Sequence, residues 1–234
     1  MPYVSHYGGP GLQIWKFNGT SWNLVGGTIA SVDGALDYPS MIVADDGTVY
    51  AAYYDKTQES TSRYGRVVKY DGSSWVQVGS NISPSPTGGV SGTAFAKGVN
   101  GTIYLHLFNW ATSRAEVYVV GDSSLTMLDE TLPNNNASGG PGQLLVNPVN
   151  GRLYSIGEWT GNGLRMTGLF SYSSMPSSGS SIGTAINGAG TGMLSTRGLA
   201  FDSTGTGYVS FIDYAAGRNT DVMKRGSNGV WTVL

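Results

Sequence analysis

Apolar and polar residues alternate along this chain in short runs, and glycine, proline or asparagine separates one run from the next. The period of the alternation is two, which is typical of β-strands, and no window keeps the 3.6-residue period of an amphipathic helix. The pattern therefore predicts an all-β protein in which many short strands are joined by tight turns.

A strand that opens on tyrosine recurs at near-constant spacing. It follows a turn in VADDGTVYAAYYD, AKGVNGTIYLHLFN, VNPVNGRLYSIGEW and FDSTGTGYVSFID, and it lacks that lead-in in PYVSHY. The five tyrosines are Tyr3, Tyr50, Tyr104, Tyr154 and Tyr208, which are 47, 54, 50 and 54 residues apart. A period of this size is typical of repeat architectures. We divide the chain into five units, roughly residues 1–36, 37–90, 91–141, 142–195 and 196–234.

Each unit contains a hairpin that is written almost identically in FNGTSWNLVGG and YDGSSWVQVGS. The tryptophans of these hairpins (Trp22, Trp75 and, in the last unit, Trp231) are predicted to pack between neighbouring units. Four antiparallel strands per unit at this period predict a five-bladed β-propeller, with residues 1–234 as one domain. The innermost strand is found in four units only. The first blade lacks it, so either the ring closes with a three-stranded blade or something else supplies the strand.

The composition of the chain argues against several classes of function. Charged residues make up 12% of the chain and the net charge is −2, which argues against a nucleic-acid partner. The chain has no cysteine, which excludes disulfides and thiolate chemistry. No apolar run is long enough for a transmembrane helix, and the N-terminus lacks a Sec-type signal pattern. The chain is therefore expected not to insert into a membrane, and its localisation stays open.

A polar residue stands beside an aromatic ring where each tyrosine strand ends. These pairs are His6-Tyr7, Tyr54-Asp55, Asn109-Trp110, Glu158-Trp159 and Asp213-Tyr214, and an arginine follows in four units (Arg63 or Arg66, Arg114, Arg165 and Arg218). A ring can stack on a pyranose while a guanidinium fork and an acceptor bind its hydroxyls. The same pairs could instead tie neighbouring blades together.

We take this pattern as a candidate glycan site. The predicted ligand-binding residues are Asn109, Trp110, Arg114, Glu158, Trp159, Arg165, Asp213, Tyr214 and Arg218, of which Trp110 and Trp159 are expected to matter most.

Metal, cofactor and catalytic motifs are weak. His6 and His106 stand at different offsets from their tyrosines, so a two-histidine metal site is not expected. VADDGT lacks the ligand pattern of a calcium loop, and GAGTGMLS lacks a phosphate-binding lysine. We expect no metal, no cofactor and no catalytic residue. Because the carboxylates are few and scattered, the protein is expected not to be an enzyme, with a glycosidase- or lyase-type propeller as the enzymatic alternative.

The repeat period, five-fold count, chain length and loop composition resemble the five-bladed propeller lectins of the tachylectin type. The resemblance is architectural and transfers no binding residue. The phrases KYDGSSWVQVG and DDGTVYAAYYD are also similar to propeller repeats of bacterial surface and phage virion proteins. These resemblances imply extracellular or virion recognition. The first hypothesis is therefore multivalent glycan binding. The alternative is a structural or host-attachment role through a protein partner, and a homo-oligomer fits either.

Overall fold

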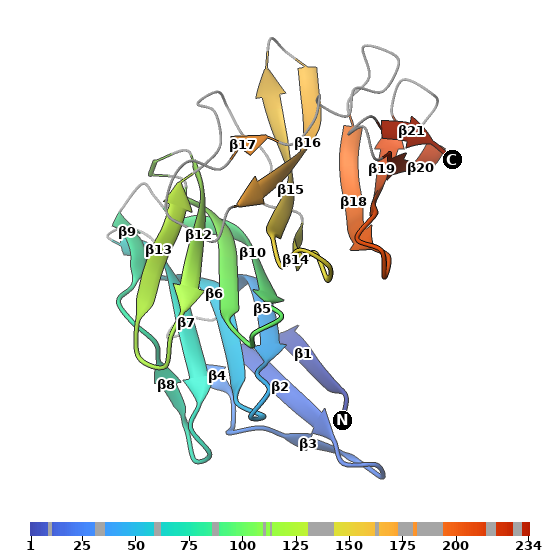
Figure 1. Ribbon diagram of the computed structural model, residues 1–234. Helices are drawn as coiled ribbons and strands as arrows, with labels where there is room; N and C mark the ends of the chain where they lie inside the picture. The colour runs from blue at the N-terminus through green and yellow to red at the C-terminus, as the bar shows by residue number, and fades with distance from the viewer. Residues whose placement is uncertain are drawn as a thin grey trace.

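The computed structural model describes residues 1–8, 11–30, 36–58, 62–85, 89–109, 111–112, 114–130, 143–161, 164–172, 180–181, 194–213, 219–226 and 231–234 (Figure 1). All regular elements in these ranges are β-strands, which confirms the all-β prediction. The same ranges contain no helix, and thus no helix that could cross a membrane.

The described strands form five antiparallel sheets, one after another along the chain. The first sheet contains β1 (Tyr3–Gly8), β2 (Gly11–Phe17), β3 (Trp22–Leu24) and β4 (Ile29–Ala30). The second contains β5 (Leu36–Val43), β6 (Val49–Gln58), β7 (Ser62–Tyr70), β8 (Trp75–Gln77) and β9 (Ile82–Ser85). The third contains β10 (Val90–Lys97), β11 (Ile103–Asn109), β12 (Arg114–Val120) and β13 (Leu125–Glu130). The fourth contains β14 (Gln143–Val146), β15 (Leu153–Gly161), β16 (Leu164–Tyr172) and β17 (Ser180–Ser181). The fifth contains β18 (Leu194–Phe201), β19 (Gly207–Asp213), β20 (Asn219–Arg225) and β21 (Trp231–Val233).

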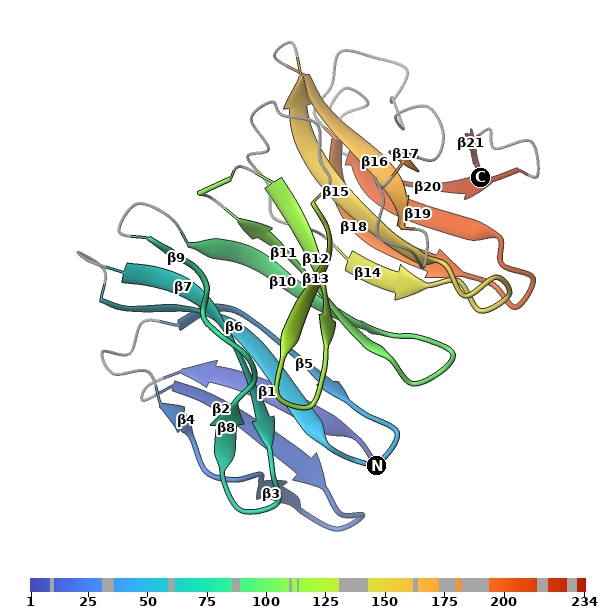
Figure 2. The same cartoon turned by 60° about the vertical axis from the view of Figure 1, so that its left-hand side comes forward.

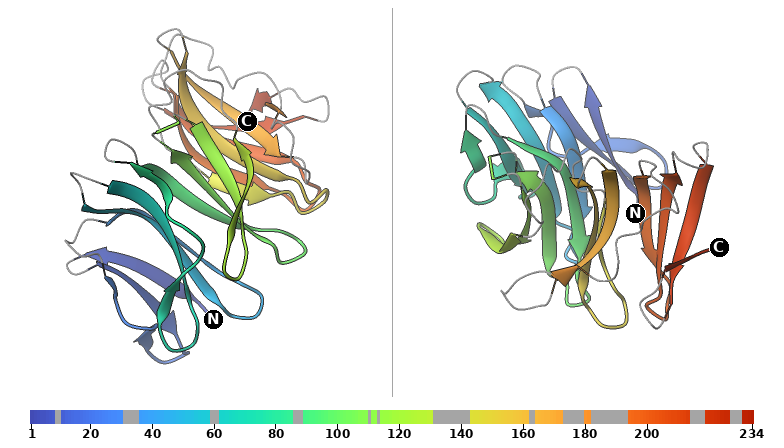
Figure 3. Two further views of the ribbon diagram at one scale, coloured as in Figure 1. Left: turned by 90° about the vertical axis from the view of Figure 1, so that its left-hand side faces the viewer. Right: turned by 90° about the horizontal axis from the view of Figure 1, so that it is seen from above.

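The sheets follow one another through their inner strands. The strands β5, β10, β14 and β18 each begin a sheet and contact one another in that order. The first sheet begins instead with β1, the counterpart of the second strand elsewhere, so among the described residues the expected inner strand is absent there. In Figures 1 and 2 the first and last sheets lie at opposite ends of the series of five sheets. Figure 3 shows the same sheets from two further directions. Closure into a five-bladed ring stays a prediction.

The hydrophobic core lies between adjacent sheets. Leu12 and Ile14 of the first sheet pack with Ala51 and Tyr53 of the second. The opposite face of the second sheet packs in the same way on the third, where the buried partners include Leu105. Successive side chains of a strand point to opposite faces, so one sheet contributes to two cores. This alternation decides which polar side chains can meet between sheets.

The repeated hairpin phrase is explained by its turn. Oδ1 of Asn18 accepts the backbone N–H groups of Thr20 and Ser21, and Oδ1 of Asp71 accepts those of Ser73 and Ser74, at 2.8–2.9 Å. The glycine that follows each acceptor, Gly19 or Gly72, has a φ above +100°, which side chains with a Cβ rarely adopt. The phrase therefore encodes an Asx turn.

Neighbouring sheets are also joined by polar contacts about one repeat apart. The indole Nε1 of Trp75 donates to the carbonyl of Val25 at 3.1 Å, so this tryptophan does pack between two sheets as predicted. Trp22 is 46% exposed, and its ring is tilted by 44° against that of Phe17 in the same sheet, so the packing predicted for it between two units is not observed among the described residues. The side chain of Trp231 lies outside the described residues.

Candidate functional site

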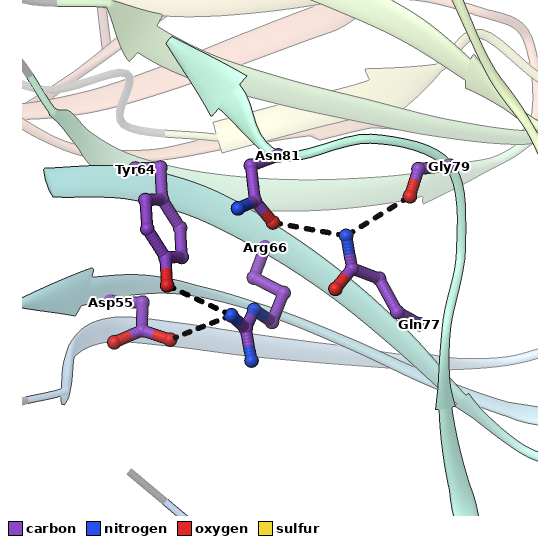
Figure 4. Close-up of polar contacts among 6 residues, drawn as sticks. All are labelled: Asp55, Tyr64, Arg66, Gln77, Gly79 and Asn81. Carbon is purple, nitrogen blue, oxygen red and sulfur yellow. Dashed lines mark hydrogen bonds and ion pairs between the residues drawn. The ribbon is translucent and has the colours of Figure 1, made fainter. Parts of the chain in front are cut away.

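A cluster of polar side chains gathers around Arg66, between the first two sheets (Figure 4). Its Nη2 donates to the phenol oxygen of Tyr64 at 2.9 Å and lies 3.5 Å from Oδ2 of Asp55. The strand register explains the meeting: Tyr53 pairs with Arg66 and Asp55 pairs with Tyr64, so all four side chains share one face of β6 and β7. We call these four residues the Arg66 cluster.

Burial differs sharply within the Arg66 cluster. The Asp55 side chain is 2% exposed, whereas the Arg66 side chain is 27% exposed. Burial raises the pKa of Tyr53 to about 12, although the charge of Arg66 acts against this shift. Burial works against the charge of Arg66 too, but Tyr53, Asp55 and Tyr64 together hold its pKa above the ordinary value. At neutral pH the cluster thus contains a protonated buried phenol beside a permanent, partly open cation.

A cavity of about 330 Å³ adjoins this cation. It is lined by Gly26, Thr28, Ile29, Tyr53, Arg66, Val68, Trp75 and Gln77. Nε of Arg66 is buried and has no hydrogen-bond partner among the described residues. An uncompensated N–H of this kind favours a ligand that brings its own acceptor. Gln77 is held beside it by hydrogen bonds from Nε2 to Gly79 and Asn81.

Of the predicted glycan-binding residues, only Asn109 has a described side chain. It ends β11 and is 5% exposed. Its amide donates to Oε1 of Glu116 at 2.7 Å and accepts from the backbone N–H of Ala111. Asn109 thus holds a buried carboxylate and a turn, and any contact with a ligand would be indirect.

The other predicted site residues are located by backbone alone or not at all. Arg114 begins β12, Asp213 ends β19, and Glu158, Trp159 and Arg165 lie inside the β15–β16 hairpin. Trp110, Tyr214 and Arg218 lie outside the described residues. Asp55, Asn109 and Asp213 each stand five residues after the tyrosine of their strand, so they occupy the same end of three sheets. The predicted site therefore stays a prediction.

Sequence reasoning named Arg66 and Asp55 but chose neither, and it missed Tyr53 and Tyr64. The sequence signal that could have found the cluster is the pairing of two alternating strands, YAAYYD and SRYGRVV. Their tyrosines, aspartate and arginine lie on one face of the sheet only when the strands pair in the observed register. A shift of one residue would separate them.

Several other carboxylates serve turns. Backbone N–H groups of Ser74 and Ser73 lower the pKa of Asp71 to about 2, and the hydroxyl of Thr204 and the N–H of Thr206 do the same for Asp202.

Burial lowers the pKa of His106 to about 3, so it is neutral in the folded protein. Within the described ranges, no three His, Asp or Glu side chains group as metal ligands.

No protein-family model matches the chain, and no curated protein is similar to it in sequence. Solved structures share its fold. One is an ulvan lyase of polysaccharide lyase family 25 bound to a GlcA–Rha3S saccharide, with a TM-score of 0.66 and 15% identity over 99% of this chain and 67% of the lyase. Another is a Hadza microbial sialidase, with a TM-score of 0.60 and 11% identity over 97% of this chain and 55% of the sialidase. A third is a GH43 endo-arabinanase from Bacillus licheniformis, with a TM-score of 0.51 and 12% identity over 98% and 92% of the two chains.

These similarities confirm the β-propeller class of fold. They do not confirm the resemblance to tachylectin-type lectins, and the chain spans only about two thirds of the ulvan lyase. The expectation of a non-enzymatic protein is contradicted, because these neighbours are a lyase, a sialidase and an arabinanase. That expectation relied on scattered carboxylates alone. It overlooked that arginine and tyrosine can also supply charge stabilisation and proton transfer.

Proposed function

We propose that the protein is a carbohydrate-active enzyme that cleaves a polysaccharide, with the Arg66 cluster as its reaction site. The observation that carries the proposal is the half-open guanidinium of Arg66, which lies between a buried carboxylate and two phenols beside a cavity. The fold is one that a lyase, a sialidase and an arabinanase share, which supports the enzymatic hypothesis over the lectin hypothesis.

The cluster favours elimination over hydrolysis. A glycosidase of the usual kind needs two carboxylates flanking the bond, and Asp55, the one carboxylate of the cluster, is buried against Arg66. In an elimination, the phenolate form of Tyr64, stabilised by the adjacent Arg66, would take the proton from the carbon next to the sugar carboxylate, the C4–O bond would break, and a C4=C5 double bond would form. Arg66 would hold that sugar carboxylate. Tyr53, protonated up to about pH 12, would return a proton to the leaving oxygen.

We further propose that the predicted glycan residues extend this site along the same ends of the strands. Asp55, Asn109 and Asp213 share one strand position, which Trp159 holds in the fourth sheet, five residues after Tyr154. Trp110 and Arg114 follow Asn109 in the chain, and Arg165 pairs with Thr160, the residue after Trp159. Rings and guanidinium groups repeated over several sheets would hold several sugar units of one chain. Each contact would be weak alone and gain strength from the others.

Polysaccharide digestion tests the proposal. Purified protein is incubated with ulvan, pectate, alginate and neutral arabinan. New reducing ends report any cleavage, and ultraviolet absorbance of the unsaturated uronate reports elimination. We expect cleavage of a uronate-containing polymer with the absorbance signal, and a loss of about 100-fold or more in kcat/KM for Arg66→Gln.

Matched variants separate catalysis from folding. Tyr64→Phe keeps the ring and should lose activity without a change in melting temperature, whereas Arg152→Gln, an exposed arginine in a turn of the fourth sheet, should behave as wild type. Cleavage that survives Arg66→Gln would contradict the site. Reducing ends without the absorbance signal would contradict elimination and favour hydrolysis. Absence of cleavage on every polymer would contradict the proposed function.

A further inference from the structure

A second and larger cavity, of about 610 Å³, lies at the other end of the same two sheets. Its lining includes Tyr3 and Lys16 from the first sheet and Asp46, Tyr70 and Asp71 from the second. It is formed where the β5–β6 and β7–β8 turns approach β1 and β2, while the Arg66 cluster lies toward the opposite ends of β6 and β7. In Figures 1 and 2 the β2–β3 and β7–β8 turns point the same way. We call this cavity the turn-end cavity.

The ammonium and carboxylate groups of the turn-end cavity can make further hydrogen bonds. Nζ of Lys16 lies 5.5 Å from the ring centre of Tyr3 and has no carboxylate partner among the described residues. Asp71 and Asp46 use Oδ1 to accept N–H groups within their own turns, at 2.8 Å. The hydroxyl of Ser73 also donates to Asp71, and that of Thr48 to Asp46. A carboxylate offers about four acceptor sites, so each can still accept a further hydrogen bond.

The junction between the second and third sheets has an ion pair that the junction between the first and second sheets lacks among the described residues. Lys69 occupies the position of Lys16 one repeat later, since it pairs with Tyr50 as Lys16 pairs with Tyr3. Lys69 forms an ion pair with Asp122, in the turn after β12. The equivalent turn position facing Lys16 is Gly72, which has no side chain. The second junction is therefore bridged by an ion pair, whereas at the first junction the ammonium of Lys16 lines a cavity and has no such pair within the described ranges.

Two aromatic rings complete the turn-end cavity. The ring of Tyr70 lies against the main chain at Gly26, in the connection between β3 and β4. The contact is so close that a Cβ at Gly26 would come within 2.4 Å of the ring. Tyr70 also donates from its hydroxyl to the carbonyl of Gly72 at 2.8 Å, which fixes the orientation of the ring. Fixed rings beside separate donors and acceptors are suited to a pyranose, which has an apolar face and vicinal hydroxyls.

We propose that the turn-end cavity is a saccharide-binding subsite for an uncharged sugar unit. The hydroxyls of the sugar accept from Lys16 and donate to Asp46 and Asp71, and its apolar face stacks on Tyr3 or Tyr70. Charge decides the class of sugar. Lys69 also lines the cavity, but its charge is balanced by the ion pair with Asp122, so Asp46 and Asp71 outnumber the one remaining ammonium, Lys16, and would repel a uronate. The subsite does not depend on the proposed catalytic role of Arg66.

Calorimetric titration tests this subsite. The Tyr64→Phe protein is titrated with cellotetraose, maltotetraose and arabinotetraose, and with trigalacturonate as the charged comparison. We expect at least one neutral tetrasaccharide to bind, and Lys16→Met and Asp71→Asn each to weaken it about tenfold. Asp71→Asn keeps the turn, since asparagine already makes the same turn at Asn18.

Lys224→Met is the matched control. Lys224 lies 5.8 Å from the ring centre of Tyr208 and pairs with it in the register of Lys16 and Tyr3, but it does not line the cavity. Binding should be unchanged in this variant. Trigalacturonate can also bind at Arg66, so the response to the cavity variants is what is compared. The proposal is overturned if no neutral tetrasaccharide binds, if Lys16→Met and Asp71→Asn weaken trigalacturonate more than every neutral tetrasaccharide, or if Lys224→Met weakens binding as much as Lys16→Met. Because these readouts measure binding, they stay informative whether or not the enzyme cleaves any polymer.

Discussion

The second and third sheets place opposite charges at the same strand position. Counted from Tyr50 and Tyr104, Arg66 in the second sheet corresponds to Glu116 in the third, and Asp55 corresponds to Asn109. Glu116 is 1% exposed and accepts hydrogen bonds from Asn109, Thr112 and Tyr118. Arg66 keeps 27% of its side chain exposed and has an Nε without a partner among the described residues.

The difference separates a structural polar network from a candidate reactive one. A buried charge is tolerated when its hydrogen-bonding capacity is used, and around Glu116 both carboxylate oxygens accept bonds. An incompletely bonded cation beside a cavity is retained at a cost in stability, which suggests a role with a ligand. The same position of the repeat thus holds a fully bonded carboxylate in the third sheet and, in the second, the cation of the proposed reaction site.

The largest expected effect concerns the third sheet at acid pH. His106 titrates at about 6.5 when unfolded and at about 3 when buried, so below pH 6.5 the unfolded state binds a proton that the folded state does not. Stability should fall by roughly 3 kcal/mol between pH 6.5 and pH 4. Urea unfolding at several pH values measures this, and His106→Leu should flatten the dependence. An unchanged slope in that variant would assign the acid sensitivity elsewhere.

Removing the buried acid is the next largest effect. Glu116→Leu leaves the amide of Asn109 and the hydroxyl of Tyr118 without their acceptor, and should cost about 2–3 kcal/mol in the free energy of unfolding. Glu116→Gln keeps one carbonyl acceptor and should cost less. Denaturant unfolding compares the two. A leucine variant as stable as wild type would show that the network contributes no stability.

The second sheet should be sensitive at the alkaline end instead. Burial keeps Tyr53 protonated to about pH 12, while an unfolded tyrosine loses its proton near pH 10. The stability that this difference provides is present below pH 10 and should decline by about 2 kcal/mol as the pH approaches 12. Tyr53→Phe should remove the decline. Tyr50→Phe should change it less, because Tyr50 is less desolvated. Denaturant unfolding midpoints of the wild type and the two variants, measured from pH 9 to pH 12, test this prediction.

The sequence predicted the all-β class and the paired hairpins, because these depend on local signals. An Asx turn needs only Asp71 or Asn18 and the residues beside it. The Arg66 cluster depends on register between β6 and β7, where a shift between Asp55 and Gln58 already breaks simple counting. The burial of Glu116 could not be read either, since a charged residue in an alternating strand is predicted to face solvent.

The smallest expected effect on stability compares two tyrosines, and it tests the contrast between the sheets most directly. Tyr118 donates to Glu116 at 2.6 Å inside the protein, so Tyr118→Phe should cost about 1–2 kcal/mol and leave catalysis intact. Tyr64 accepts from a partly exposed arginine, so Tyr64→Phe should cost less than about 0.5 kcal/mol while polysaccharide cleavage is lost. Melting temperature and kcat/KM are measured on both variants. If the two variants lose stability and activity in the same proportion, the second sheet holds no reaction site distinct from its packing.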